Sequence, residues 1–382
     1  MDRRTLLFGA AAFFAAAAIP SNLPLIDEKS ALEQICQSSI PQQERKKFEG
    51  LWGLLLRYNQ KRNEVYTERK KELEESQFDP ALVSSLEQKA DVYWQDVVKF
   101  AKENLPGIVK GNDIDYDELK RVSIDQKRVF ARYPHIKNPS VQSIILGDLV
   151  EEKEEDFQYK NQKIRYGYVK FETAGNNLDN ILNKGKSAWW DNKNKVAYVN
   201  LTVLKEMGGY IFYYGGDLEN KRPHDYRGAL IKELYNNIMG EVRKENPVYF
   251  NILPESQKNK IFVRKFVNIL SDLSIRHERM HYFYPYSSDI EESKKKEKET
   301  YLSQIAGDDR FNSAVFLMIY DGGGYEELYK LLERPLLQKA GYNDETAKNL
   351  SAEEKLKIIH DTTARISPAE RSRMATNILN SL

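Results

Sequence analysis

Residues 262–284 read FVRKFVNILSDLSIRHERMHYFY and are followed by Pro285. Apolar side chains recur in this stretch with the spacing of one helical face: Phe266, Ile269, Leu270 and Leu273. That spacing is typical of an amphipathic helix. A proline disfavours the helical conformation of the residue before it. The stretch therefore predicts a helix over residues 262–284 that buries its apolar face and ends before Pro285.

The second half of this helix carries two of the five histidines of the chain, His277 and His281. Residues four apart lie on the same helical face, one turn apart, so the two imidazoles can bind one cation. Zn²⁺ binds imidazole nitrogen at about 2.0–2.1 Å and in catalytic sites keeps one position for water. Glu278 is rotated by about 100° from His277, so it can lie beside the ion and accept a proton from water.

The pattern H-E-x-x-H at residues 277–281 resembles the zincin metallopeptidases, and the resemblance covers residues 274–283. It implies a hydrolase of peptide bonds that holds one Zn²⁺ per chain between His277 and His281, with Glu278 as the catalytic general base. Arg279 departs from the family pattern, which prefers uncharged residues at that position. We expect the Arg279 side chain to point away from the metal, toward an acidic partner or solvent.

The third metal ligand distinguishes the zincin subgroups. Tyr284 and Ser287 stand where metzincins have a glycine and a third ligand, which excludes that subgroup and its aspartate variant. Gluzincins take a glutamate from a second helix, some eighteen or more residues downstream. Glu299 lies 18 residues after His281, so the gluzincin resemblance implies Glu299 as the third ligand. The competing glutamates are Glu292 and Glu297.

Amide hydrolysis also requires a hydrogen-bond donor for the developing oxyanion, in addition to the metal. Three residues remain open for this role: Tyr325, His224 and His360. The expected partner is a peptide or protein substrate. An extended substrate can pair with the edge of a sheet, and predicted strands at residues 163–171 or 195–201 could supply that edge.

The segments around the motif predict an α+β fold that is rich in helix and has a small β-sheet. Residues 21–139 are expected to form a helical extension built on a long helical hairpin, and residues 140–382 a zincin-like metallopeptidase domain. Strand patterns lie at residues 163–171, 196–201 and 210–214. Helical patterns lie at residues 27–105, 117–132, 226–244, 291–306, 311–320, 325–333 and 351–361.

The first 21 residues, MDRRTLLFGAAAFFAAAAIPS, have the features of an export signal. Their apolar run, residues 6–19, is shorter than the roughly 20 residues that a membrane-spanning helix needs. A charged start, an apolar run and small residues near a cleavage position are typical of a signal peptide, which we place at residues 1–20. Arg3 and Arg4 resemble a twin-arginine signal. The chain is expected to be secreted, periplasmic or cell-surface, or anchored by residues 6–19 if it is not cleaved.

The composition of the 382 residues limits the remaining function classes. Lys and Arg number 58 and Asp and Glu number 57, a net charge of +1, which argues against a nucleic-acid partner. The single cysteine, Cys36, excludes a disulfide framework and a cysteine-rich metal site. The sequence predicts an exported zinc metallopeptidase. The alternative is a structural or interaction protein of the cell envelope whose zincin-like domain is inactive.

Overall fold

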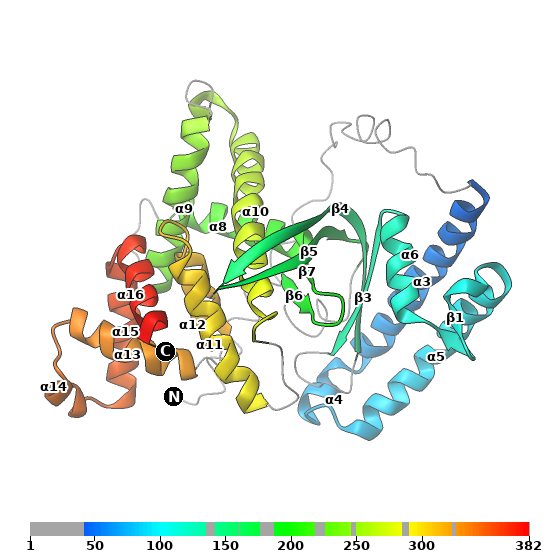
Figure 1. Cartoon of the computed structure of the whole chain (residues 1–382), viewed down its shortest axis with the longest axis horizontal. Helices are drawn as coiled ribbons and strands as arrows, with labels where there is room; N and C mark the ends of the chain where they lie inside the picture. Colours follow the sequence, from blue (N-terminus) through cyan, green and yellow to red (C-terminus); the bar gives the residue numbers. More distant parts are fainter. Residues whose placement is uncertain are drawn as a thin grey trace. The chain divides into compact units, whose positions relative to one another are not determined.

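The computed structural model describes residues 42–134, 142–159, 161–175, 187–217, 226–245, 250–284, 290–322 and 326–381. These residues form the predicted helix-rich α+β fold with a small sheet (Figure 1). The chain divides into two compact units: Met1–Val150 with Glu172–Gly185, and Glu151–Phe171 with Lys186–Leu382. The predicted division at residue 139 falls within the first unit and stays a prediction.

The predicted export signal, residues 1–20, lies outside the described residues. Among the helices that the structure does describe, none combines the length and the apolar content needed to cross a membrane.

The first unit contains the predicted helical hairpin. Its helices are α3 (Gln42–Glu68), α4 (Lys70–Glu75), α5 (Pro80–Asn104), the 3₁₀ turn η1 (Pro106–Ile108) and α6 (Tyr116–Asp125). Phe100, late in α5, packs on Gly50, early in α3. Arg62, late in α3, forms an ion pair with Glu87, early in α5. These contacts require α3 and α5 to run antiparallel, so the hairpin prediction is confirmed for residues 42–104.

The strands of the first unit correct the prediction of a helix over residues 117–132. That helix, α6, ends at Asp125, and Arg128–Pro134 form β3 instead. β3 pairs antiparallel with β4 (Gln142–Tyr159), and a short hairpin joins β1 (Val109–Lys110) to β2 (Asp113–Ile114). Lys127 has a positive φ of 59°, which a continuing helix does not allow. Val129 and Phe130 are fully buried in the strand, so tertiary pairing decides their conformation.

The sheet has the strand order β3-β4-β5-β7-β6, and β4 and β5 each contribute residues to both units. In the second unit, β5 (Gln162–Thr173) pairs parallel with β7 (Val196–Asn200), which pairs antiparallel with β6 (Ala188–Asp191). Trp189 and Tyr198 are register partners, and their rings stack at 5.1 Å. The strands predicted at residues 163–171 and 196–201 are therefore confirmed.

The strand predicted over residues 210–214 is wrong, because these residues belong to helix α8 (Leu201–Asp217). Tyr210 and Tyr214 are four apart and their rings lie 4.4 Å apart, which is the helical spacing. Glycines let α8 approach its neighbours closely. A Cβ at Gly208 would lie 2.9 Å from the ring of Phe266, and one at Gly215 would lie 2.5 Å from Tyr235. Helix packing thus overrides the strand propensity of the aromatic run.

The remaining helices confirm most of the predicted C-terminal order. They are α9 (Tyr226–Glu245), η2 (Phe250–Ile252), α10 (Glu255–Met280), α11 (Ile290–Ala306), α12 (Ser313–Gly322), α13 (Glu326–Lys339), α14 (Asp344–Lys348), α15 (Ala352–Arg365) and α16 (Pro368–Ser381). The helix that carries the histidines, α10, begins at Glu255 rather than at Phe262, and it ends at Met280.

The second unit has two hydrophobic clusters. The sheet-side cluster packs α8, α9 and α10 against β5 and β7; its members include Tyr166, Val199, Leu234, Phe266, Leu270 and Leu273. The C-terminal cluster packs α11 to α13, α15 and α16 together; its members include Leu302, Ile305, Phe316, Leu332 and Ile359. Helices α10 and α11 contact one another. The C-terminal end of α10, which carries the histidines, therefore lies where the two clusters meet.

A buried arginine, Arg371 of α16, joins four helices or their ends. Its guanidinium has no exposed surface. Nε donates to Asn312 Oδ1 at 3.0 Å and Nη1 donates to the carbonyl of Thr363 at 2.9 Å. The same guanidinium forms an ion pair with Glu233 of α9. The arginine provides a hydrogen-bond or ion-pair partner for each of these groups, so Arg371 links several helices of the second unit.

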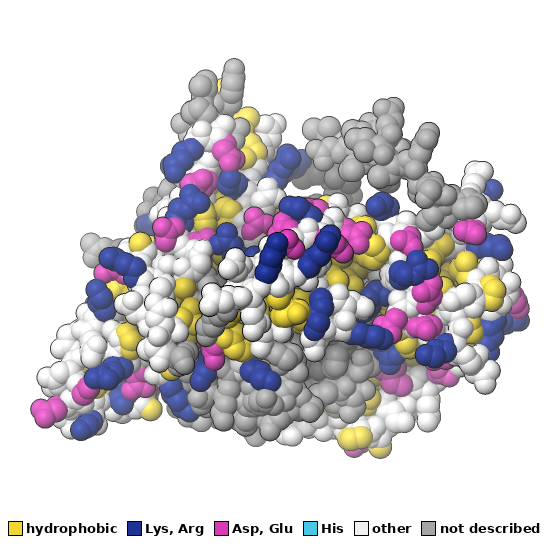
Figure 2. Space-filling view, in the orientation of Figure 1, with side chains coloured by type: hydrophobic (Ala, Val, Ile, Leu, Met, Phe, Trp, Pro, Cys, Tyr) yellow, Lys and Arg dark blue, Asp and Glu magenta, His cyan; other side chains and the backbone are white. Residues whose placement is uncertain are grey.

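Exposed charges on the sheet are paired across strands. On β4 and β5, Lys163 lies 2.7 Å from Asp156 and Arg165 lies 2.6 Å from Glu154. On the face of the molecule in Figure 2, basic and acidic side chains are interspersed. Such pairs are solvated and contribute little to stability.

Candidate metal centre

The last turns of α10 bury the histidines by continuing its apolar face. Leu270 and Leu273 are almost fully buried, and the same face continues through Ser274 to His277 and His281. His277 is 7% exposed and His281 is fully buried. His281 is also the residue that caps the C-terminus of α10. The amphipathic pattern that folds the helix therefore carries both imidazoles into the interior.

The structure brings His277 and His281 together with Glu297 of α11. His277 Nε2 lies 3.4 Å from Glu297 Oε2, and His281 Nε2 lies 3.6 Å from Glu297 Oε1. Ligand atoms at the corners of a tetrahedron around Zn²⁺ are about 3.3 Å apart, given metal–ligand distances of 2.0–2.1 Å. The two contacts of Glu297 are close to that spacing, and one atom from each of the three side chains lies within 4.8 Å of the others, so the group could hold a metal ion such as zinc.

The charge in this cluster also suits a divalent cation. Glu278 is 5% exposed, and its Oε2 lies 3.9 Å from His281 Nε2. Burial alone lowers the pKa of His277, but the hydrogen bond to Glu297 and the charges of Glu297 and Glu278 outweigh burial and raise that pKa above its ordinary value. Two carboxylates held in a low-dielectric site favour a positive charge between them.

Contacts outside the cluster orient the imidazole rings. His281 Nδ1 lies 3.1 Å from the carbonyl oxygen of Tyr284. A neutral imidazole that donates from Nδ1 has its Nε2 lone pair free for a metal. The ring of Tyr301 packs on the His277 ring, with centroids 4.4 Å apart. The His281 ring is thus held in the tautomer that presents Nε2 toward Glu297.

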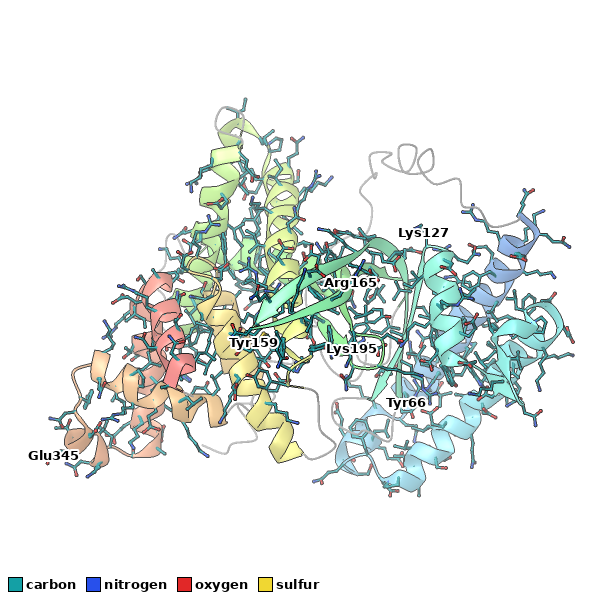
Figure 3. The ribbon with its side chains drawn as sticks, in the orientation of Figure 1. Tyr66, Lys127, Tyr159, Arg165, Lys195 and Glu345 are labelled. Carbon is teal, nitrogen blue, oxygen red and sulfur yellow. The ribbon has the colours of Figure 1, made fainter. Side chains whose placement is uncertain are left out.

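Glu299, the expected third ligand, is not part of this group. The hydroxyl of Tyr284 is hydrogen-bonded to Glu299 and lies 3.4 Å from the hydroxyl of Tyr159, which Figure 3 labels at the end of β4. Burial, followed by these hydrogen bonds, raises the pKa of Tyr284. Residues 297 and 299 are two apart in α11 and point about 200° apart, so only one of them faces the histidines.

Glu297 therefore replaces Glu299 as the candidate third ligand, and the side chain of Glu292 lies outside the described part of the chain. The count of residues after His281 could not distinguish them. The helical phase of α11 does, because Glu297 lies two turns before Gln304, which is 2% exposed, on the face that meets α10. The burial of Gln304 depends on a tertiary contact, which no local pattern of the sequence predicts.

Arg279, the departure from the family pattern, packs against the sheet. Its guanidinium carbon lies 3.7 Å from the centre of the Phe157 ring, and it is hydrogen-bonded to the hydroxyl of Tyr166. Tyr166 in turn donates to Glu155 Oε2 at 3.1 Å. The positive charge of Arg279 therefore lies in an aromatic and acidic setting on β4 and β5 rather than among the metal-ligating atoms.

Of the three candidates for oxyanion stabilisation, only His360 lies in the described part of the chain. His224 and Tyr325 lie outside the described residues. His360 of α15 stacks on Tyr226, with ring centroids 4.0 Å apart, and its Nε2 lies 3.3 Å from the hydroxyl of Tyr329. Burial lowers the pKa of His360 to about 4. His360 is not a member of the metal-ligating group, and its contacts are those of a packed neutral residue.

His360 predicts a pH dependence of stability. Its pKa is about 4 in the folded chain and about 6.5 when unfolded, so between these values the unfolded state binds more protons. Its contribution is therefore present above about pH 6.5 and is lost as the pH falls toward 4. Urea unfolding of His360→Phe is expected to lose less stability than wild type from pH 7 to 4. Equal losses would contradict this assignment.

Compared with protein-family models, with curated proteins and with solved structures, the chain matches none of them.

Proposed function

We propose that this chain is a zinc-dependent peptidase whose metal ligands are His277, His281 and Glu297 and whose general base is Glu278. The observation that carries the proposal is the convergence of three ligand atoms, all within 4.8 Å of one another, beside a buried carboxylate that is not among them. A structural site needs only ligands. The additional acid is the element that a hydrolytic site requires.

In this proposal each side chain has a separate task. A bound Zn²⁺ would lower the pKa of a water molecule and polarise the scissile carbonyl. Glu278 accepts the proton of that water and delivers it to the leaving amine. Glu278 Oε2 lies 3.9 Å from His281 Nε2, beside the ligand atoms, and Glu278 is not a member of the group of three. The proposed substrate is a peptide or protein, and export by residues 1–20 remains part of the proposal.

The burial of both imidazoles favours a second candidate, a cell-envelope structural or interaction protein with a non-catalytic metal site. Structural zinc sites are closed, whereas catalytic sites keep an open position. In this cluster the most accessible side chain is that of Glu297, which is 23% exposed, against 9% for His277 and 1% for His281. Metal binding without hydrolysis, and no effect of Glu278→Gln, would support this candidate.

Zinc stoichiometry tests the ligand set. The purified full chain is expected to bind about one zinc ion, and His277→Ala, His281→Ala and Glu297→Ala are each expected to lose it, because two protein ligands hold the ion far more weakly than three. Glu299→Ala is the matched control, since it removes a carboxylate two residues away in the same helix, and it is expected to retain zinc.

The measurement is metal content after dialysis, together with far-UV circular dichroism to confirm folding. Retention of zinc by Glu297→Ala and its loss from Glu299→Ala would restore Glu299 as the third ligand. A wild-type chain that binds no zinc would overturn the proposed function.

A further inference from the structure

Gln304 of α11 contacts α10, the helix that carries the histidines, two turns after Glu297 on the same face of α11. It is 2% exposed, and its Nε2 donates a hydrogen bond of 2.9 Å to the carbonyl oxygen of Leu273. Leu273 lies one helical turn before His277. A buried carboxamide is thus anchored at the turn of α10 that precedes the first histidine.

The His277 ring lies next to this carboxamide. Side chains in a helix lean toward its N-terminus, so the ring of His277 covers the turn that contains Leu273. The carboxamide of Gln304 lies within reach of this ring. Because Nε2 of His277 faces Glu297, the nitrogen on the side of Gln304 is Nδ1.

The hydrogen bond of the Gln304 NH₂ group determines which atom of the carboxamide faces His277. The NH₂ group of Gln304 is committed to the Leu273 carbonyl, so the atom left for His277 is Oε1, which can only accept. His277 Nδ1 and Gln304 Oε1 are both buried from solvent, and neither atom has a well-aligned hydrogen-bond partner within the described ranges. A buried acceptor beside a buried ring nitrogen favours the tautomer with the proton on Nδ1.

We propose that Gln304 is a positioning residue that holds His277 in the Nδ1–H tautomer, so that the Nε2 lone pair points at the metal. The inference rests on the proposed metal centre and not on hydrolysis. The carbonyl of Tyr284 has the same relation to His281, so each imidazole has an acceptor behind its metal-binding nitrogen. Loss of such a partner typically weakens metal binding 10- to 100-fold.

The test measures the zinc dissociation constant of the full chain by competition with a chromophoric chelator. Gln304→Leu removes the hydrogen bond to Leu273 and the buried acceptor beside His277 Nδ1, and it is expected to weaken zinc binding about 10- to 100-fold. Gln304→Glu keeps an acceptor for Nδ1 but loses the donor to Leu273, and it is expected to bind zinc at least as tightly as wild type. Gln338→Leu, an exposed position of α13, is the control and is expected to leave affinity unchanged.

A comparison of zinc affinity between the two Gln304 variants separates a positioning role from a purely structural one. Gln304→Leu and Gln304→Glu both lose the bond to Leu273, so a purely structural role would weaken zinc binding in both. Rescue of zinc affinity by glutamate alone therefore supports positioning. Equal affinity in wild type and Gln304→Leu, or equally weak binding in both variants, would overturn the inference. A wild-type chain without zinc affinity would instead overturn the metal centre itself.

Discussion

Glu278→Gln is expected to reduce peptide hydrolysis by about 10²- to 10⁴-fold and to leave zinc binding intact. Glutamine has the shape of glutamate but cannot accept a proton from water. Glu278 is 5% exposed and is not one of the three grouped ligands, so the variant keeps the packing and the metal. The measurement is kcat on a mixture of unstructured peptides with zinc present, together with the zinc content of the same sample.

Glu299→Gln is the matched control, because it makes the same chemical change on α11 outside the ligand group. It is expected to retain activity close to that of wild type. Wild-type activity in Glu278→Gln would contradict the role of the general base. Loss of zinc from Glu278→Gln would show instead that this carboxylate is a ligand.

The largest expected loss of stability follows from Arg371→Met, at about 3–5 kcal/mol. The arginine side chain has no exposed surface. Its removal takes the arginine's hydrogen bonds or ion pair away from three acceptors: Glu233, Asn312 Oδ1 and the Thr363 carbonyl. Burial already raises the pKa of Glu233, against the opposing charge of Arg371. Without that charge the carboxylate is left in a poorly solvated position. The measurement is the free energy of unfolding in urea at pH 7.

Arg334→Met provides the comparison for this loss. Arg334 forms a well-aligned pair with Asp344 at 2.8 Å, but both side chains are more than half exposed. Its loss is expected to cost about 1 kcal/mol or less. Equal losses in the two variants would contradict the structural role of Arg371. The double change Arg371→Met with Glu233→Met should recover part of the stability, because it removes the stranded charge.

The sequence predicts helices well where an apolar stripe is long and where a capping residue or a proline marks its end. Asp79 before Pro80 marks the start of α5, and its carboxylate accepts hydrogen bonds from the backbone of Ala81 and Leu82. Prediction failed where tertiary packing chose between two conformations that the local sequence allows. Residues 128–132 join a strand partner, and residues 210–214 pack as a helix through Gly208 and Gly215.

The same distinction between local pattern and tertiary packing separates the site residues that the sequence predicts from those that it does not. His277, Glu278 and His281 belong to one helix, so their relative placement follows from helical geometry alone. The third ligand comes from α11, and its identity depends on the rotation of that helix against α10. A residue count cannot supply this rotation. Gln304 was equally inaccessible to a local pattern, because its partner Leu273 is 31 residues away.

The position of the ligands between two hydrophobic clusters has a consequence for cooperativity. His277 and His281 extend the helix that carries Leu270 and Leu273 into the sheet-side cluster, whereas Glu297 belongs to the helix that carries Leu302 into the C-terminal cluster. An ion bound by all three side chains would link the two cores, and they would be expected to unfold in a single transition. Without the ion the two cores remain linked through α9 and Arg371, so the metal-free chain is expected to unfold with lower cooperativity rather than as two independent parts.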